Sequence, residues 1–170
     1  MVATALLAAA APAAMAVEEN GYREPAQVLK DMALAPVTPS LVFDGNYTMR
    51  IELTRNTFIS LAELAQTELR LAGVRFNPDT YSESRRPGFS DAKLVNMKNG
   101  QELSVTGLPA GKTIWCAEFY NDDQNILLGV REDDGIYLYS ASVTDGAATR
   151  LTDYRLHQVM SSTSYGVANT

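Results

Sequence analysis

The side chains that could perform peptide chemistry are few in this chain. The only histidine, His157, is followed within seven residues by Ser161, Ser162 and Ser164. A serine nucleophile of the α/β-hydrolase type stands in a Gly-x-Ser-x-Gly turn, and its acid and histidine follow later in the chain. No such turn sequence occurs, and residues this close in sequence rarely form a triad. We therefore interpret His157 as a strand-edge or loop residue and predict no catalytic residue.

Metal ligands are equally sparse. The lone cysteine, Cys116, lies in an apolar strand-like run and is interpreted as an inert core thiol. The acidic pairs Asp122-Asp123 and Asp133-Asp134 suggest calcium, which favours clustered carboxylates. No EF-hand spacing surrounds them, and aspartate is a preferred turn residue. Turns are the favoured interpretation, and we predict no metal and no cofactor.

The remaining charged and aromatic residues favour structural roles. Arg85-Arg86 precedes Pro87-Gly88, which indicates a solvated loop more than an anion site. Four aromatic residues fall at strand spacing and are interpreted as packing residues: Trp115, Phe119, Tyr137 and Tyr139. The 14 basic and 20 acidic side chains give a net charge of −6. This balance argues against a nucleic-acid partner, whose binding needs a basic face.

The first sixteen residues resemble a targeting segment. An uncharged, Ala- and Leu-rich run ends in Ala14-Met15-Ala16, a cleavage-site pattern. Residues 1–16 are therefore predicted to be a signal peptide, although no basic residue precedes the apolar run. The run is too short to span a bilayer, and no membrane contact is predicted after cleavage. We expect export to the periplasm or outside a bacterial cell.

A repeat of 46 residues organises the rest of the chain. Residues 98–106 (KNGQELSVT) are echoed by residues 144–152 (TDGAATRLT), each with a polar-Gly turn before a short strand. A period of about 40 to 50 residues made of strands and turns is typical of β-propeller blades. We predict an all-β fold, a partial β-propeller of about two four-stranded blades and the start of a third, with short N-terminal helical segments.

The predicted boundaries follow this period. Residues 17–39 form an N-terminal extension, and residues 40–170 form an incomplete propeller domain. Its blade-like units cover about 40–106 and 107–152, and residues 153–170 begin an unfinished unit.

Local patterns predict the elements of the first part. A short helix is expected from Pro25 to Met32, with Val28, Leu29 and Met32 on one face. A hairpin is expected from Leu41 to Leu53, with Tyr47, Met49, Ile51 and Leu53 alternating on one face.

The next segment combines a helix start with an ambiguous run. Ser60-Leu61-Ala62-Glu63 is a capping box that starts a helix running at least to Gln66. Residues 68–73 either continue this helix or begin a strand that runs through Phe76, and the residues after Gly73 favour the strand. Residues 77–90 are polar and predict a surface loop.

The second unit is the clearest. Its four predicted strands run over residues 114–120, 126–130, 136–143 and 149–152, with polar turns between them.

Longer strings show a family resemblance. Residues 22–40 (YREPAQVLKDMALAPVTPS) and 59–78 (ISLAELAQTELRLAGVRFNP) resemble secreted peptidases of the prolyl oligopeptidase (S9) family. The second string is similar to the branch that includes glutamyl endopeptidase, and specifically to its bacterial relatives. Two shorter strings, at residues 105–109 and 150–153, resemble blade-closing strings of that family.

The resemblance implies an N-terminal β-propeller over a C-terminal α/β-hydrolase domain with a Ser-Asp-His triad, where the propeller limits access of peptide substrates. Family members usually carry Ser-Pro-Asp-Gly in their blades, whereas this chain has LVFDG at 41–45 and YNDD at 120–123. No catalytic residue is carried over, because the hydrolase domain is absent from this sequence.

Three functional hypotheses remain open. The first is the propeller fragment of an exported S9-type serine peptidase, inactive alone and partnered by a C-terminal hydrolase domain. The alternative is a stand-alone, propeller-like binding module that self-associates. The third is a unit that is active with a hydrolase domain on a separate chain.

Overall fold

The computed structural model describes residues 23–159 and divides the chain into two units, residues 1–35 and 36–170. The predicted signal peptide, residues 1–16, lies outside the described residues. Within residues 23–159, no helix is long and apolar enough to cross a membrane.

In the described part of the first unit, residues 23–35, the chain forms one short helix. Helix α1 (Gln27–Ala33) confirms the helix predicted over residues 25–32. Lys30 pairs with Glu24 at 2.5 Å, and the Gln27 amide donates to Asp31 at 2.7 Å. The predicted apolar face of this helix is exposed to solvent.

The second unit is all-β, as predicted, apart from the single helical turn α2 (Leu61–Leu64). The eight strands of its main sheet are β1 (Ser40–Phe43), β2 (Met49–Arg55), β6 (Phe89–Asn96), β7 (Glu102–Ser104), β8 (Thr113–Tyr120), β9 (Asn125–Arg131), β10 (Ile136–Ser142) and β11 (Ala148–Arg150). A second, three-stranded sheet contains β3 (Leu69–Leu71), β4 (Val74–Asn77) and β5 (Ser82–Glu83). The strands predicted in the second half of the chain are confirmed.

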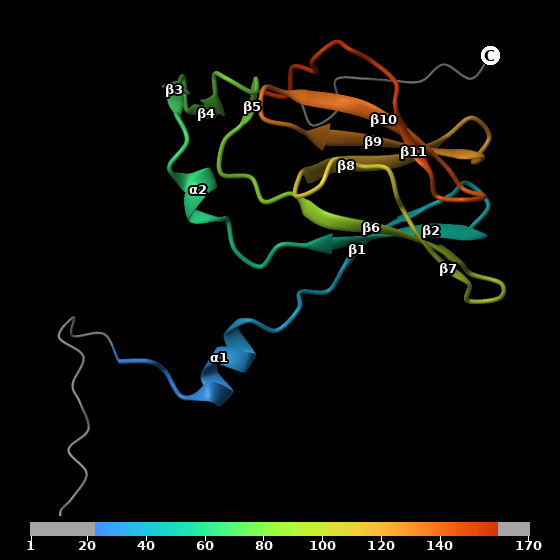
Figure 1. Ribbon diagram of the computed structural model, residues 1–170, viewed down its shortest axis with the longest axis horizontal. Helices are drawn as coiled ribbons and strands as arrows, with labels where there is room; N and C mark the ends of the chain where they lie inside the picture. The colour runs from blue at the N-terminus through green and yellow to red at the C-terminus, as the bar shows by residue number, and fades with distance from the viewer. Residues whose placement is uncertain (1–22, 160–170) are drawn as a thin grey trace, which may run out of the picture. The chain divides into compact units, whose positions relative to one another are not determined.

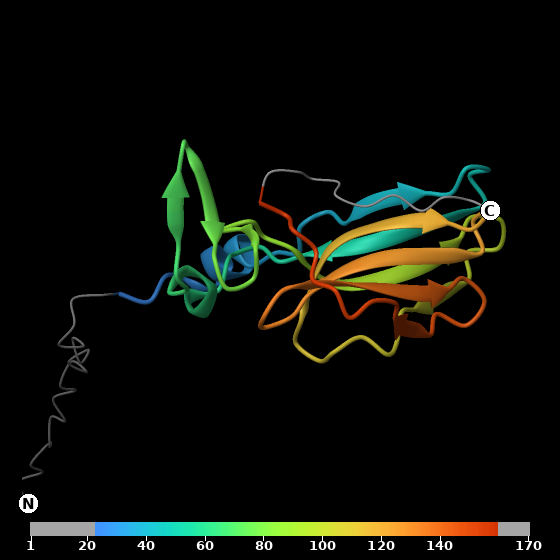
Figure 2. The same ribbon diagram turned by 90° about the horizontal axis from the view of Figure 1, so that it is seen from above.

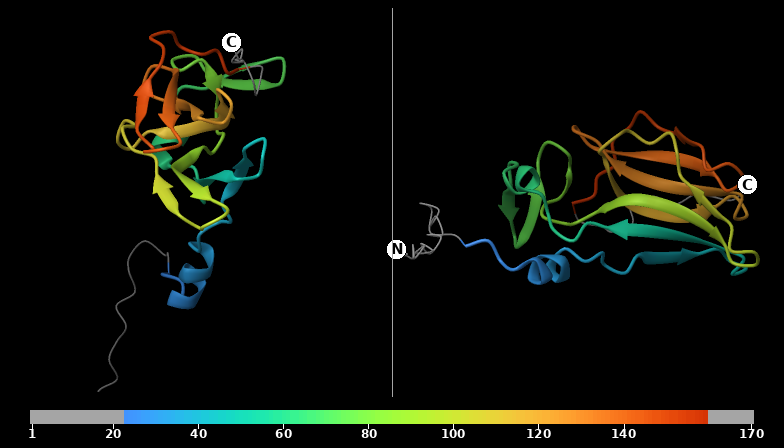
Figure 3. Two further views of the ribbon diagram at one scale, coloured as in Figure 1. Left: turned by 90° about the vertical axis from the view of Figure 1, so that its right-hand side faces the viewer. Right: turned by 60° about the horizontal axis from the view of Figure 1, so that its bottom comes forward.

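The main sheet consists of two antiparallel meanders. The first meander pairs β1, β2, β6 and β7 in that order, and the second pairs β8, β9, β10 and β11. A single ladder pair, Phe89 with Ile114, joins them into one unclosed sheet. The meanders lie as neighbouring layers, the second above the first in Figure 1 and again in Figure 3.

The two copies of the sequence repeat make the same turn. In the first copy the Asn99 carboxamide oxygen accepts from the N–H of Gln101 at 2.9 Å. In the second, the Asp145 carboxylate accepts from the N–H of Ala147, also at 2.9 Å. The glycine between each pair has a positive φ, 71° and 69°, which non-glycine residues rarely adopt. The repeat in sequence is therefore a repeat in backbone geometry.

The strand that follows each turn is attached at equivalent positions. The N–H of Val105 donates to the carbonyl of Ala92 at 3.1 Å. The N–H of Leu151 donates to the carbonyl of Leu138 at 2.8 Å. Donors and acceptors are both 46 residues apart, so the period extends over the last two strands of each meander.

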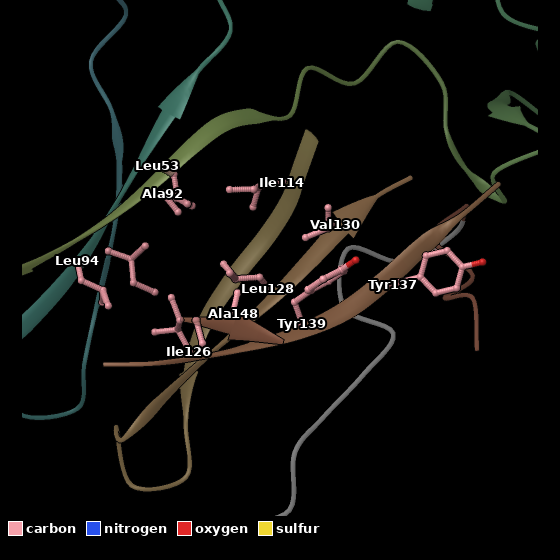
Figure 4. Packing of buried hydrophobic residues seen from close by; sticks show 12 residues of the cluster. Leu53, Ala92, Leu94, Ile114, Ile126, Leu128, Val130, Tyr137, Tyr139 and Ala148 are labelled. Carbon is pink, nitrogen blue, oxygen red and sulfur yellow. The ribbon is translucent and has the colours of Figure 1, made fainter. Parts of the chain in front are cut away.

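The meanders share one hydrophobic core. Ile51, Leu53 and Leu94 of the first meander are at most 2 % exposed, and they cluster with residues of the second. Figure 4 shows Leu53 and Leu94 of the first meander in one cluster with side chains of the second, such as Ile114. The second meander contributes eight residues to the cluster: Ile114, Ile126, Leu128, Val130, Tyr137, Tyr139, Ala141 and Ala148. Since burial of a large aliphatic side chain stabilises by about 1.5 to 3 kcal/mol, this shared core is the main attachment between the layers.

The polar tips of the core tyrosines are satisfied by the turn before β10. The Tyr137 hydroxyl donates to Asp134 at 2.8 Å, and the Tyr139 hydroxyl donates to Glu132 at 2.9 Å. Burial and the Glu132 carboxylate raise the pKa of Tyr139 to about 12. Their burial confirms that these two aromatic residues are packing residues.

The other predicted aromatic residues also pack. Phe119 lies against the core cluster, and Trp115 is 2 % exposed on the opposite face of β8.

The alternation of side chains predicted for Tyr47, Met49, Ile51 and Leu53 is wrong at its first residue. Tyr47 lies in the turn before β2, with φ 55° and its side chain exposed, because the strand begins only at Met49.

A main-chain contact also joins the meanders. The N–H of Thr106 donates to the carbonyl of Gly146 at 2.9 Å, and its carbonyl accepts from Ala148 at 2.8 Å. Gly107, with φ 80°, passes so close that a Cβ there would lie 2.5 Å from the Ala148 oxygen. Glycine is required at 107 both by backbone conformation and by this close approach.

Replacing Gly107 with alanine should therefore cost more free energy of unfolding than replacing Gly111. Gly111 has a similar φ of 70° but open space around its Cα. Left-handed strain of about 1 kcal/mol applies to both variants, and crowding of the Ala148 carbonyl adds about 1 to 3 kcal/mol for Gly107→Ala only. Urea unfolding of the two variants measures the difference. Equal losses would mean that the contact at Thr106 does not hold the meanders together.

Candidate functional site

One end of the second unit carries all the long connections. In antiparallel meanders alternate connections lie at opposite ends, which separates a loop end from a turn end. The loop end holds residues 56–88, 105–112 and 132–135. The turn end holds residues 44–48, 97–101, 121–124 and 143–147. Figure 2 shows the 56–88 connection, hereafter the insertion, projecting beyond the strands at the loop end.

The insertion begins with the predicted capping box. The Ser60 hydroxyl accepts from the N–H of Glu63 at 3.1 Å, which confirms the helix start. The predicted extent is wrong, because α2 ends at Leu64 and not at or beyond Gln66. The Glu63 side chain does not complete the box, and turns instead toward Arg131 on β9.

The ambiguous run after this turn forms strands. Leu69–Leu71 and Val74–Asn77 pair across the two-residue turn Ala72-Gly73, whose φ angles of 49° and 85° are those of a tight hairpin. The strand interpretation is confirmed, although two strands replace the single strand expected. The predicted surface loop 77–90 is wrong in part, since it contains β5 and the start of β6, and Asn77, Thr80 and Ser82 are buried in it.

The Glu68 carboxylate joins the β3–β4 hairpin of the insertion to Ser84 and Arg85, which follow β5. Glu68 accepts hydrogen bonds from Arg70 at 3.0 Å, Arg85 at 2.8 Å and the Ser84 hydroxyl at 2.9 Å, and Arg75 lies 3.4 Å away. The Ser84 hydroxyl, followed by Arg70 and Arg85, holds the pKa of Glu68 below its usual value. This cluster gives Arg85 an ion-pair partner, while Arg85 itself lies exposed in a turn, as the predicted solvated loop requires.

A second contact ties the insertion to the second meander. Arg131 pairs with Glu63 at 2.9 Å, with both side chains mostly buried, although the two groups are not aligned as a hydrogen bond. The Arg131 guanidinium lies 5.5 Å from the ring centre of Trp115, and that of Arg86 lies 4.7 Å from it. Two arginines therefore pack on the only tryptophan of the chain.

Residues 155–158, which follow β11, also bind the insertion. The N–H of Gln158 donates to the carbonyl of Tyr81 at 2.8 Å, and its carbonyl accepts from Glu83 at 3.1 Å. Arg155 packs 4.9 Å from the Tyr81 ring. Residues of β9 and of the segment after β11 thus hold the insertion in place.

A cavity of about 460 Å³ lies beside the insertion at the loop end. The β7–β8 connection, residues 105–112, forms one wall, and Asn56, Ser90 and Asp91 contribute to another. Ile114 and Val130 supply apolar surface. Its volume falls within the range of small-ligand pockets.

Of the histidine, cysteine and serines singled out in the sequence, the structure describes His157 and Cys116. The His157 ring lies 6.2 Å from that of Tyr81, whereas Ser161, Ser162 and Ser164 lie outside the described residues. Cys116 is half-buried in β8, where its sulfur would lie 2.6 Å from a Cβ at Gly129. Within residues 23–159, no three His, Cys, Asp or Glu side chains are grouped to hold a metal ion.

The acidic pairs lie in turns, as predicted. Asp123 accepts from the N–H of Gly45 at 3.1 Å, joining the first turns of the two meanders. Asp133 pairs with Lys112 at 2.5 Å, and Asp134 binds a core tyrosine. Sequence reasoning missed Glu68 and Arg131 as organising residues, since no local pattern links either to its distant partners.

Comparisons with known proteins give a peptidase name. The chain is 30 % identical over 119 residues to a protein of Arabidopsis thaliana named probable glutamyl endopeptidase, chloroplastic. It is 29 % identical over 141 residues to a protein of the same name from Oryza sativa subsp. japonica. These alignments cover 68 % and 77 % of this chain but 12 % and 15 % of the relatives. No family model matches the chain. The chain is therefore homologous, at low identity, to a small part of a plant protein with a peptidase name.

Replacing Glu68 with glutamine should lower stability at pH 7 but not in acid. The folded state lowers the pKa of Glu68, so the stabilisation is present above the unfolded pKa of about 4.3 and is lost as pH falls through the folded pKa. Urea unfolding followed by Trp115 fluorescence, at several pH values, measures the gap between the variant and the natural chain.

The gap should be widest near neutral pH and close below pH 4. Glu24→Gln is the control, since its exposed pair with Lys30 is worth less than about 1 kcal/mol. A gap for Glu68→Gln that is the same at pH 3 and pH 7 would contradict the assigned role.

Proposed function

We propose that this chain is the N-terminal propeller portion of an exported S9-type serine peptidase, where it limits peptide access to a C-terminal α/β-hydrolase domain. The observation that carries the proposal is the repeated meander, with hydrogen bonds that recur after 46 residues. Four-stranded antiparallel units with this period are the building blocks of β-propellers. The sequence relation to proteins named glutamyl endopeptidase supports the peptidase part.

The chemistry of the described residues is consistent with an accessory role. The ring of His157 lies 6.2 Å from that of Tyr81 in the insertion, a packing contact between two structural segments. The insertion and the β7–β8 connection project from one end of the sheet, where a gate for a neighbouring domain would stand. On this proposal the partners are the hydrolase domain and peptide substrates, and residues 1–16 direct export to the periplasm or beyond.

The outer face of the first meander disfavours a module that closes its ring with copies of itself. This face points away from the shared core and carries two ion pairs, Arg50 with Glu52 at 2.6 Å and Lys93 with Glu102 at 2.8 Å. A copy of this chain packed on it would desolvate these charged side chains, which is costly.

A domain chimera tests the proposal. Residues 17–170 replace the matching segment of the Arabidopsis thaliana relative, and hydrolysis is measured with peptides that carry Glu, Pro or Ala at the cleavage point. The chimera should fold and hydrolyse short peptides, because the meanders supply equivalent blades. This chain alone should match buffer, because it has no Gly-x-Ser-x-Gly turn.

Two results would decide against the proposal. Turnover by this chain alone, abolished by a serine-directed fluorophosphonate, would reveal a nucleophile within it. A chimera that is inactive, while this chain alone binds the same peptides, would favour the stand-alone binding module.

A further inference from the structure

Strand β3 is an open edge of the three-stranded sheet. The sheet order is β3-β4-β5, and β5 is continued by the bridge from Ser82 to Gln158. Within the described residues, β3 therefore has a partner on one side only, and Figure 1 shows it at the outer limit of the insertion. An unpaired strand edge is a template for another strand.

The hairpin geometry identifies the main-chain groups at this edge. Leu71 and Val74 flank the two-residue turn, so they form a hydrogen-bonded pair, and the pairing alternates along the strand. Leu69 and Leu71 therefore direct their N–H and C=O groups to β4. Those of Arg70 point to the open edge.

The two faces of β3 differ in polarity. Glu68 and Arg70 lie on one face and form an ion pair at 3.0 Å. Leu69 and Leu71 lie on the other, and they are 47 % and 70 % exposed. Exposed leucines on an open edge are unfavourable for an isolated domain, because strand edges are usually protected by charge or cover.

We propose that β3 pairs antiparallel with β3 of a second copy of this chain, with the two-fold axis at Leu69. The arrangement joins two three-stranded sheets into one and places Leu69 against its own copy. This interface does not depend on the peptidase function proposed above.

Charge selects the register. Centring the pair on Leu69 sets Glu68 of each copy opposite Arg70 of the other. The alternative register that satisfies the main chain is centred on Arg70, and it sets the two guanidinium groups opposite each other. Like charges directly opposite destabilise a strand pair, whereas opposite charges stabilise it. The edge is therefore self-complementary in one register only, as a two-fold interface requires.

The oligomeric state of the full chain tests the interface. Analytical ultracentrifugation between about 1 and 500 μM should show a monomer–dimer equilibrium. Arg70→Ala should weaken the dimer, by about tenfold or less, because one opposite-charge pair is lost at each end. Arg70→Pro should abolish the dimer while leaving the hairpin bonds intact, because the lost N–H faces the open edge.

Leu71→Lys should also weaken the dimer, and Tyr154→Lys is its control, because Tyr154 is 83 % exposed but lies outside β3. Amide hydrogen exchange gives a readout that does not depend on any variant. The Arg70 amide should become protected as concentration rises, whereas the Leu69 and Leu71 amides should be protected at every concentration.

Three outcomes would overturn the proposal or its register. A monomer at 500 μM would overturn the proposal, as would a dimer that persists in Arg70→Pro with the Arg70 amide unprotected. A dimer strengthened by Arg70→Ala would show the Arg70-centred register and overturn the one proposed.

Discussion

The packing of the two meanders against each other is the interaction on which the rest of the structure depends. A four-stranded meander has two faces and cannot bury both, so each needs a neighbour. Here Ile51 and Leu94 of the first meander meet Leu128 and Val130 of the second in one cluster. Polar contacts add to this core, since Thr106 binds the main chain of Gly146 and Ala148 and Asp123 accepts from the N–H of Gly45.

The loop end depends on that core for its geometry. Arg131 is the last residue of β9. The position of β9 is fixed by its own core residues, Ile126, Leu128 and Val130. The contacts of Arg131 with Glu63 and Trp115 then fix the insertion, which has little apolar burial of its own. The result is a rigid layer pair with a polar, ion-paired attachment at one end. Elements of this kind vary in sequence more readily than cores and commonly carry function.

The sequence predicted most of the second meander, because its strands alternate and its turns carry Asn, Asp and Gly. It predicted less of the insertion, whose order comes from contacts that are distant along the chain. Glu68 reaches Arg85, Glu63 reaches Arg131, and Tyr81 is bound by Gln158. The prediction that Tyr47 belongs to the strand was wrong, because two residues are too few for the sequence to distinguish the end of a turn from the start of a strand. The absence of a local nucleophile motif was readable from sequence, whereas the arginine packing on Trp115 was not.

Native-state hydrogen exchange of Ile51 and Leu128 tests most directly whether the two meanders form one cooperative unit. These residues lie in the central strands of different meanders and face the same core. If the core is shared, their amides should exchange with equal free energies and equal dependence on denaturant, since both require the same global opening. Exchange of Ile51 at a clearly lower free energy than Leu128 would show that the first meander opens alone, and would contradict the shared core.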